Sequence, residues 1–162
     1  MPVIKFVNEK YTSFKAMENL IHYIMAAKKT PNRIIGAIAV YPLEEAAIVR
    51  HFKQTQVLHR NQKKNRALHI VLSFSPEESQ WLTFKDYGKI GYSVANYYGK
   101  ANHQVVFALH EDTDNPHIHF VINTVNNLTG RKYHQQHKDY VKIRTIAENK
   151  TAKIVNRRSG KA

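Results

Sequence analysis

The chain has 162 residues, of which 43% are apolar, and this length and composition fit one folded domain and exclude a wholly disordered chain. Lysine and arginine total 25 against 12 acidic residues, so the formal net charge is +13. A charge this large on a small domain indicates a polyanionic partner, either nucleic acid or an acidic membrane. Because the chain has no cysteine, disulfides and thiolate metal sites are excluded.

In chain order, segments of strand character alternate with segments of helical spacing. In the first helical segment, Leu20, Tyr23, Ile24 and Ala27 follow the candidate N-cap Ser13. We expect strands at residues 3–7, 34–40, 67–74, 104–110 and 117–125, and helices at residues 14–27, 43–55, 84–99 and 137–154. The last two strands are six residues apart and predict a hairpin. The order favours an α+β fold, a mainly antiparallel central sheet flanked by helices.

The two ends of the chain carry different signals. Residues 149–162 are basic and predict a mobile tail, which leaves residues 1–148 as the folded domain. The N-terminus lacks the apolar run of a signal peptide, and no stretch approaches the roughly 20 apolar residues that span a bilayer. We therefore expect a cytoplasmic protein without membrane insertion.

The predicted hairpin concentrates histidines at its closed end. His117 and His119 lie two residues apart and therefore share one face of a strand, while His110 ends the preceding strand. If the hairpin register places His110 on that face, three imidazoles converge, as a divalent metal ion requires. Three protein ligands leave coordination positions open, which is typical of catalytic metal sites. Asp112, in the loop, is available to orient a ligand histidine.

The segment HEDTDNPHIHFVIN, from His110 to Asn123, resembles the third motif of the relaxases, the nicking enzymes of plasmid mobilisation and conjugation. The similarity is to the MobP-like branch of the endonucleases that share a His-hydrophobic-His pair. Two weaker motifs precede it in the expected order: NLIHYI at residues 19–24 and HIVLSF at residues 69–74. The resemblance implies a relaxase or rolling-circle endonuclease fold for the nuclease domain at residues 1–148.

The resemblance also implies a reaction and roles for individual residues. A tyrosine hydroxyl attacks a DNA phosphodiester and leaves a free 3′-hydroxyl and a 5′-phosphotyrosyl link. The nucleophile would be Tyr23; Ser73 would position the strand and Asp112 would orient or activate. A related branch uses histidine as its nucleophile, so His22 stays open as the alternative to Tyr23.

The metal-binding residues implied by the resemblance are His110, His117 and His119. They would hold a divalent ion, Mn²⁺ or Mg²⁺ by resemblance. An all-imidazole ligand set suits Mn²⁺, Zn²⁺ or Ni²⁺ better than Mg²⁺, so the identity of the metal stays open.

The expected partner is single-stranded DNA at an origin of transfer, together with accessory transfer proteins. The basic residues near the motifs are the candidate phosphate contacts: Lys28, Lys29, Arg33, Lys63, Lys64, Arg66, Arg131 and Lys132. Two alternatives stay open. One is a rolling-circle replication initiator, although in most initiators the tyrosine follows the histidine pair. The other is a non-catalytic basic nucleic-acid-binding module.

Overall fold

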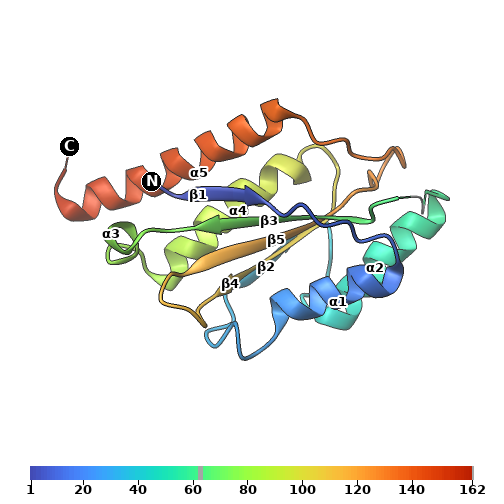
Figure 1. The fold of residues 1–162 in the computed structure, drawn as a ribbon, viewed down its shortest axis with the longest axis horizontal. Helices are drawn as coiled ribbons and strands as arrows, with labels where there is room; N and C mark the ends of the chain where they lie inside the picture. Colours follow the sequence, from blue (N-terminus) through green and yellow to red (C-terminus); the bar gives the residue numbers. More distant parts are fainter. Residues whose placement is uncertain (62–63, 162) are drawn as a thin grey trace.

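The structure is a computed structural model, and it describes residues 1–61 and 64–161. An antiparallel sheet of five strands, in the order β1, β3, β5, β4, β2, forms its middle layer (Figure 1). The strands are β1 (Val3–Phe6), β2 (Ile35–Ile38), β3 (Ala67–Ser73), β4 (Val105–His110) and β5 (His117–Asn123). The two central strands, β3 and β5, pair along their whole length, from Ala67 opposite Asn123 to Ser73 opposite His117.

Helices cover both faces of the sheet, as Figure 1 shows. Apolar side chains of α1 (Phe14–Met25) and α2 (Glu45–Leu58) pack on one face. Those of α4 (Phe84–Gly99) and α5 (His137–Ser159) pack on the other, while α3 (Pro76–Ser79) is a single turn. The predicted α+β fold with an antiparallel sheet is confirmed.

Alternation along β5 decides which face carries the histidines. Ile118, Phe120 and Ile122 belong to the core under α4 and α5, whereas Val121 belongs to the core under α1 and α2. Since successive side chains point to opposite faces, His117 and His119 lie on the face of α1 and α2. His110 pairs directly with His117 in the β4–β5 register and lies on that face too.

Several element ends differ from the prediction. The first helix ends at Met25 rather than at residue 27, and the Arg33 guanidinium donates a hydrogen bond to the Met25 carbonyl. The second strand stops at Ile38 because Ala39 has a φ of 59°, outside the strand region. The second helix begins at Glu45, after Pro42, and continues to Leu58.

The helix predicted at residues 137–154 is confirmed and continues to Ser159, so residues 149–159 of the predicted mobile tail belong to α5. Ile154 is buried in the core under this helix, and Thr151 is buried as well. Arg158 forms an ion pair with the buried Asp86 of α4. Gly160, with a φ of 75°, caps the helix in the left-handed conformation. A periodic apolar stripe and one ion pair therefore order a segment whose basic composition suggested mobility.

Two glycines of α4 are expected to respond to alanine with opposite signs. A Cβ at Gly91 would lie 2.4 Å from Cε2 of Phe107, whereas the nearest atom to a Cβ at Gly88 is 3.9 Å away, on Ile34. Gly88→Ala should stabilise the protein by about 0.5–1 kcal/mol through helix propensity. Gly91→Ala should destabilise it by about 1–3 kcal/mol, because overpacking outweighs that gain. Urea unfolding measures both values, and changes of the same sign would contradict the packing described here.

Candidate active site

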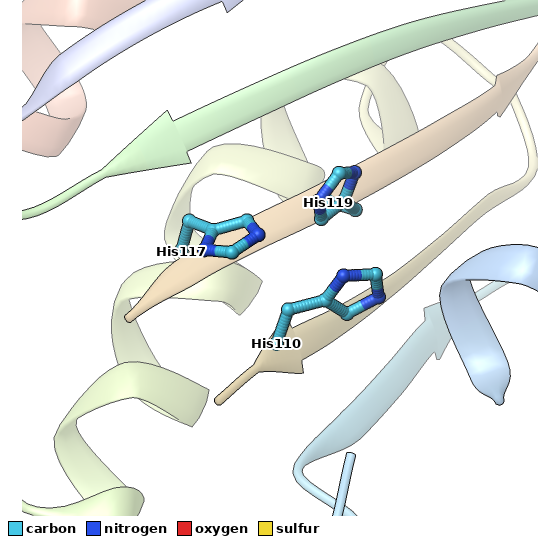
Figure 2. Close-up of side chains that lie close together, drawn as sticks. All are labelled: His110, His117 and His119. Atoms are coloured by element: carbon cyan, nitrogen blue, oxygen red, sulfur yellow. The ribbon is translucent and has the colours of Figure 1, made fainter. Parts of the chain in front are cut away.

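Three histidines converge at the hairpin end of β4 and β5. Figure 2 shows His117 and His119 on β5 and His110 on β4, with their rings on the same side of the sheet. Each offers a ring nitrogen, and these atoms all lie within 4.8 Å of one another. The ring centroids of His110 and His119 are only 4.0 Å apart. The register on which the predicted metal site depends is therefore the one observed.

Hydrogen bonds from His110 and His117 to backbone carbonyl oxygens determine which nitrogen of each ring is free. His110 Nε2 lies 2.9 Å from the Ile24 carbonyl oxygen, and His117 Nδ1 lies 2.9 Å from the Asn115 carbonyl oxygen. A carbonyl oxygen only accepts, so these nitrogens carry the protons. The opposite nitrogens, His110 Nδ1 and His117 Nε2, then have lone pairs available for a metal.

His119 completes the set. Its Nδ1 lies 2.8 Å from His69 Nε2, and its Nε2 is buried without a hydrogen-bond partner among the described residues, as is His110 Nδ1. Two buried, unpartnered nitrogens beside a third imidazole are what a bound cation would satisfy. The residues present thus fit a divalent metal ion.

Burial favours the neutral form of His119, His69 and His110, and the neutral form of an imidazole is the one that binds metal. Burial, reinforced by His110, lowers the pKa of His119 to about 2. Burial also lowers the pKa of His69 to about 4. For His110, burial lowers the pKa although its hydrogen bond to Ile24 acts in the opposite direction.

Tyr23 lies directly over two of the histidines. Its ring meets those of His110 and His119 edge to face, with centroid distances of 5.5 and 5.6 Å, and the residue is 41% exposed. His22 points elsewhere: its Nδ1 lies 2.8 Å from Oε1 of Glu45, at the start of α2. Of the two candidate nucleophiles, the structure brings Tyr23 to the histidines and leaves His22 away from them.

An ion pair borders Tyr23. Lys29 Nζ lies 2.9 Å from Oδ2 of Asp112 and 4.9 Å from the centroid of the Tyr23 ring. The hydrogen bond from Lys29 lowers the pKa of Asp112, and the same bond raises the pKa of Lys29. Ser73 is half-buried and faces His117 in the β3–β5 register. Both predicted accessory residues, Asp112 and Ser73, therefore lie at the site.

The predicted phosphate contacts divide into two groups. Of the residues that follow α1, Lys29 lies over the Tyr23 ring, Lys28 is exposed, and Arg33 donates to the Met25 carbonyl and the Thr30 hydroxyl. The described members of the second group lie around the opposite end of β5, about 20 Å from His117 at roughly 3.3 Å per residue; they are Lys64, Arg66, Arg131 and Lys132. The structure does not bring these four residues to the histidines.

Within the second group, the side chains differ in what they contact. Arg66 covers the Phe14 ring at 4.0 Å and donates to the Thr12 carbonyl, so it has a structural role. Burial lowers the pKa of Lys132 to about 8. Lys64 and Arg131 are exposed. The candidate Lys63 lies outside the described residues.

Sequence reasoning missed His69 as part of the site. It belongs to the segment HIVLSF, in which Ser73 was the only residue considered. His69, Val71 and Ser73 alternate along β3 and so share the face of His117 and His119. That periodicity was the available signal.

A family model described as the relaxase MobA/VirD2-like nuclease domain matches residues 23–154, most of the chain. The chain belongs to this relaxase family. The match begins at Tyr23 and includes the three histidines, so the resemblance found in the motifs is confirmed over nearly the whole fold. In the part of this relaxase domain that the structure describes, no helix has the length and apolar character needed to cross a membrane.

Individual relatives agree with this assignment. Protein rlx of Staphylococcus aureus is 34% identical over 94 residues, which cover 57% of this chain and 28% of that protein. Protein TraI of Escherichia coli is 28% identical over 136 residues, covering 82% of this chain and 17% of that protein. The relaxase domain thus spans less than a third of the length of these curated relatives.

A solved structure shares the fold. It is the MobM relaxase domain, bound to plasmid pMV158 oriT DNA in a crystal structure with Mn. The TM-score is 0.59 over 94% of this chain and 86% of that one, at 12% sequence identity. This likeness confirms the predicted relaxase-like architecture.

Proposed function

We propose that this relaxase domain nicks and rejoins one DNA strand at a specific site during transfer of a plasmid or mobile element. The observation that carries the proposal is the position of Tyr23, a half-exposed phenol in contact with His110 and His119. Three imidazoles whose ring nitrogens converge and an accessible nucleophile form the minimum set for metal-assisted phosphoryl transfer.

The proposed reaction is a transesterification. Tyr23 Oη attacks the phosphorus of the scissile phosphodiester, and a bond forms between Oη and phosphorus as the bond from phosphorus to the 3′-oxygen breaks. The phenol loses its proton and the 3′-oxygen gains one, so the products are a 5′-phosphotyrosyl link and a free 3′-hydroxyl. Because no water is consumed, attack by a 3′-hydroxyl on the same link rejoins the strand.

The protein must lower the cost of forming a phenolate, because the pKa of a free tyrosine is near 10. The Lys29 ammonium, 4.9 Å from the centroid of the Tyr23 ring and paired with Asp112, would stabilise the developing phenolate. A divalent cation held by His110, His117 and His119 would polarise the phosphoryl oxygens. Mn²⁺ suits imidazole ligands better than Mg²⁺ does, and Mn is the metal named for MobM.

Single-stranded DNA at an origin of transfer is the proposed substrate, with accessory transfer proteins as further partners. The net charge of +13 supports a polyanionic substrate. The oriT DNA bound to MobM, which shares the fold, points to the same substrate class. Since lysine and arginine contacts to phosphate release counterions, binding should weaken steeply with salt. Ser73, beside His117, is placed to position the strand.

The decisive experiment is a covalent-adduct assay. Purified protein is incubated with Mn²⁺ and labelled single-stranded oligonucleotides from the transfer origin of its own element, and adducts are separated on a denaturing gel. We expect an adduct that maps to Tyr23 by mass spectrometry and is absent with EDTA and in Tyr23→Phe. His22→Ala should retain it.

Other results would overturn the proposal in distinct ways. An adduct that survives Tyr23→Phe and is lost in His22→Ala moves the nucleophile to His22. An adduct formed with a replication-origin oligonucleotide and not with transfer-origin DNA indicates a rolling-circle initiator. Tight, salt-sensitive binding without any adduct in Mn²⁺ or Mg²⁺ indicates a non-catalytic nucleic-acid-binding module.

Lys29 and its neighbour Lys28 provide a matched pair of variants. Lys29→Met removes the ammonium beside Tyr23 and should slow adduct formation by about 10- to 100-fold. This is less than the roughly 100- to 1,000-fold lost when a donor that bonds directly to the developing charge is removed. Lys28→Met, at an exposed position, should weaken DNA binding slightly and leave the rate at saturating DNA unchanged. Single-turnover kinetics measures both effects, and equal rates for the two variants would exclude this role for Lys29.

A further inference from the structure

A chain of hydrogen bonds leads from His119 away from the three-histidine site. His119 Nδ1 lies 2.8 Å from His69 Nε2, and His69 Nδ1 lies 3.1 Å from the Tyr11 hydroxyl. The Tyr11 hydroxyl donates to Oε2 of Glu9 at 3.3 Å. His69, His119 and Tyr11 are all more than 90% buried, and the two imidazole rings stack with centroids 5.0 Å apart. Of these four residues only Glu9, the last group in the series of hydrogen bonds, is exposed.

The three metal-site histidines differ in how their protons are placed. For His110 and His117 a backbone carbonyl accepts the ring proton, and this leaves one possible tautomer. His119 has an imidazole as its neighbour instead, and an imidazole nitrogen either donates or accepts. The tautomer of His119 therefore depends on that of His69, which in turn depends on Tyr11.

The Glu9 carboxylate determines in which direction the hydrogen bonds of this series are donated. A carboxylate only accepts, so Glu9 draws the proton of the Tyr11 hydroxyl, and the Tyr11 oxygen then offers a lone pair to His69 Nδ1. His69 consequently carries its proton on Nδ1 and presents a lone pair on Nε2 to His119. His119 in turn holds its proton on Nδ1 and keeps its buried Nε2 free.

We propose that His69, Tyr11 and Glu9 are positioning residues that hold His119 in its metal-binding tautomer. This inference rests on the proposed metal site and adds to it the groups that orient its most buried ligand. In the reverse direction, His69 would donate from Nε2 and His119 would carry its proton on Nε2, where it would block the metal. The hydrogen-bond chain from Glu9 through Tyr11 and His69, called the relay below, excludes that state. Residues that hydrogen-bond to a metal ligand in this way commonly change metal affinity by about 10- to 100-fold.

His69 itself is not a fourth ligand. Both of its ring nitrogens are occupied, Nε2 by His119 and Nδ1 by Tyr11. Within the described residues, the cluster of groups able to share one metal ion consists of His110, His117 and His119. The role of His69 is therefore exerted through His119.

The test uses three variants and two readouts. His69→Phe keeps an aromatic ring next to His119 but removes the acceptor, Tyr11→Phe removes only the hydroxyl, and His69→Gln restores an acceptor. Long-range ¹H–¹⁵N correlation spectra of metal-free protein at neutral pH report the tautomer of His119. Electron paramagnetic resonance of free Mn²⁺ during a titration reports metal affinity.

We expect the wild-type protein to show His119 with its proton on Nδ1. In His69→Phe and Tyr11→Phe the tautomer with the proton on Nε2 should become populated. The Mn²⁺ affinity of His69→Phe should fall by about 10- to 100-fold, that of Tyr11→Phe should fall by a smaller factor, and His69→Gln should recover most of the loss.

Tyr97→Phe is the matched control. The Tyr97 hydroxyl also donates to a carboxylate, that of Asp139 at 2.5 Å, but on α4, which covers the opposite face of the sheet. Its removal should leave the His119 tautomer and the Mn²⁺ affinity unchanged. Circular dichroism shows whether each variant is folded, and Tyr11→Phe keeps the test available if His69→Phe does not fold.

The outcomes separate this inference from the proposed function. An unchanged His119 tautomer in Tyr11→Phe and in folded His69→Phe overturns the relay, whether or not Mn²⁺ binds. Equal Mn²⁺ affinity of the wild type, His69→Phe and Tyr11→Phe overturns the relay as well. A wild-type protein that binds no Mn²⁺ overturns the metal site, and the tautomer readout still decides the direction of the hydrogen-bond chain.

Discussion

Replacing His119 with alanine is expected to reduce Mn²⁺ affinity by more than about 100-fold, beyond the 10- to 100-fold that losing an outer partner typically costs. The substitution removes one of three ligand nitrogens. It also removes the ring in contact with Tyr23. Formation of the covalent DNA adduct should be lost at Mn²⁺ concentrations that saturate the wild type. A Mn²⁺ titration followed by electron paramagnetic resonance, together with the adduct assay, measures both effects.

His134→Ala is the control for this substitution, because it removes an exposed histidine outside the three-histidine cluster. It should bind Mn²⁺ and form the adduct as the wild type does. If His119→Ala retained wild-type Mn²⁺ affinity, the cation would have to be held elsewhere, and the three-histidine site would be wrong.

Replacing Asn123 with leucine is expected to destabilise the protein by about 2–6 kcal/mol. The Asn123 side chain is fully buried and uses all its hydrogen-bonding groups. Its Oδ1 accepts from Gln56 Nε2 at 2.9 Å and from the Val125 amide at 3.1 Å. Its Nδ2 donates to Gln104 Oε1 at 2.8 Å and to the Phe52 carbonyl at 3.2 Å. Gln56 Nε2 keeps its bond to the Arg66 carbonyl and the Phe52 carbonyl lies within α2. Leucine has a similar volume but leaves the Val125 amide and Gln104 Oε1 buried without the Asn123 partner, at about 1–3 kcal/mol each.

Urea unfolding of Asn123→Leu measures this cost, with Asn96→Leu as the control. Asn96 is exposed on α4, so the same substitution there should change the free energy of unfolding by less than about 0.5 kcal/mol. Equal effects of the two substitutions would show that the buried network contributes little. The expected difference also assigns Asn123, a residue of the relaxase-like motif, to holding β5 in place rather than to chemistry.

Periodicity within single elements was enough to predict much of the fold. The α4 helix begins and ends where its pattern indicates, and alternation on β5 correctly placed His117 and His119 on one face. Prediction failed at ends that depend on contacts with residues outside the element. The bond from Arg33 to Met25 joins residues on either side of a turn, and the pairing of Arg158 with Asp86 connects residues 72 positions apart. Local propensity contains no information about such contacts.

In the candidate site, too, some features could be predicted from the sequence and others depend on contacts between separate elements. The spacing of His110, His117 and His119 predicted a metal site, and the resemblance of the surrounding motifs to those of relaxases implied a metal-dependent nuclease with Tyr23 as its nucleophile. Contacts between separate elements decided the rest: Tyr23 rather than His22 faces the imidazoles, Lys29 pairs with Asp112, and His69 holds His119. Residue types and spacing determine which chemistry is available. Only the pairing of strands and the packing of α1 onto the sheet decide which atoms meet, because those atoms come from segments about 50 to 90 positions apart in the chain.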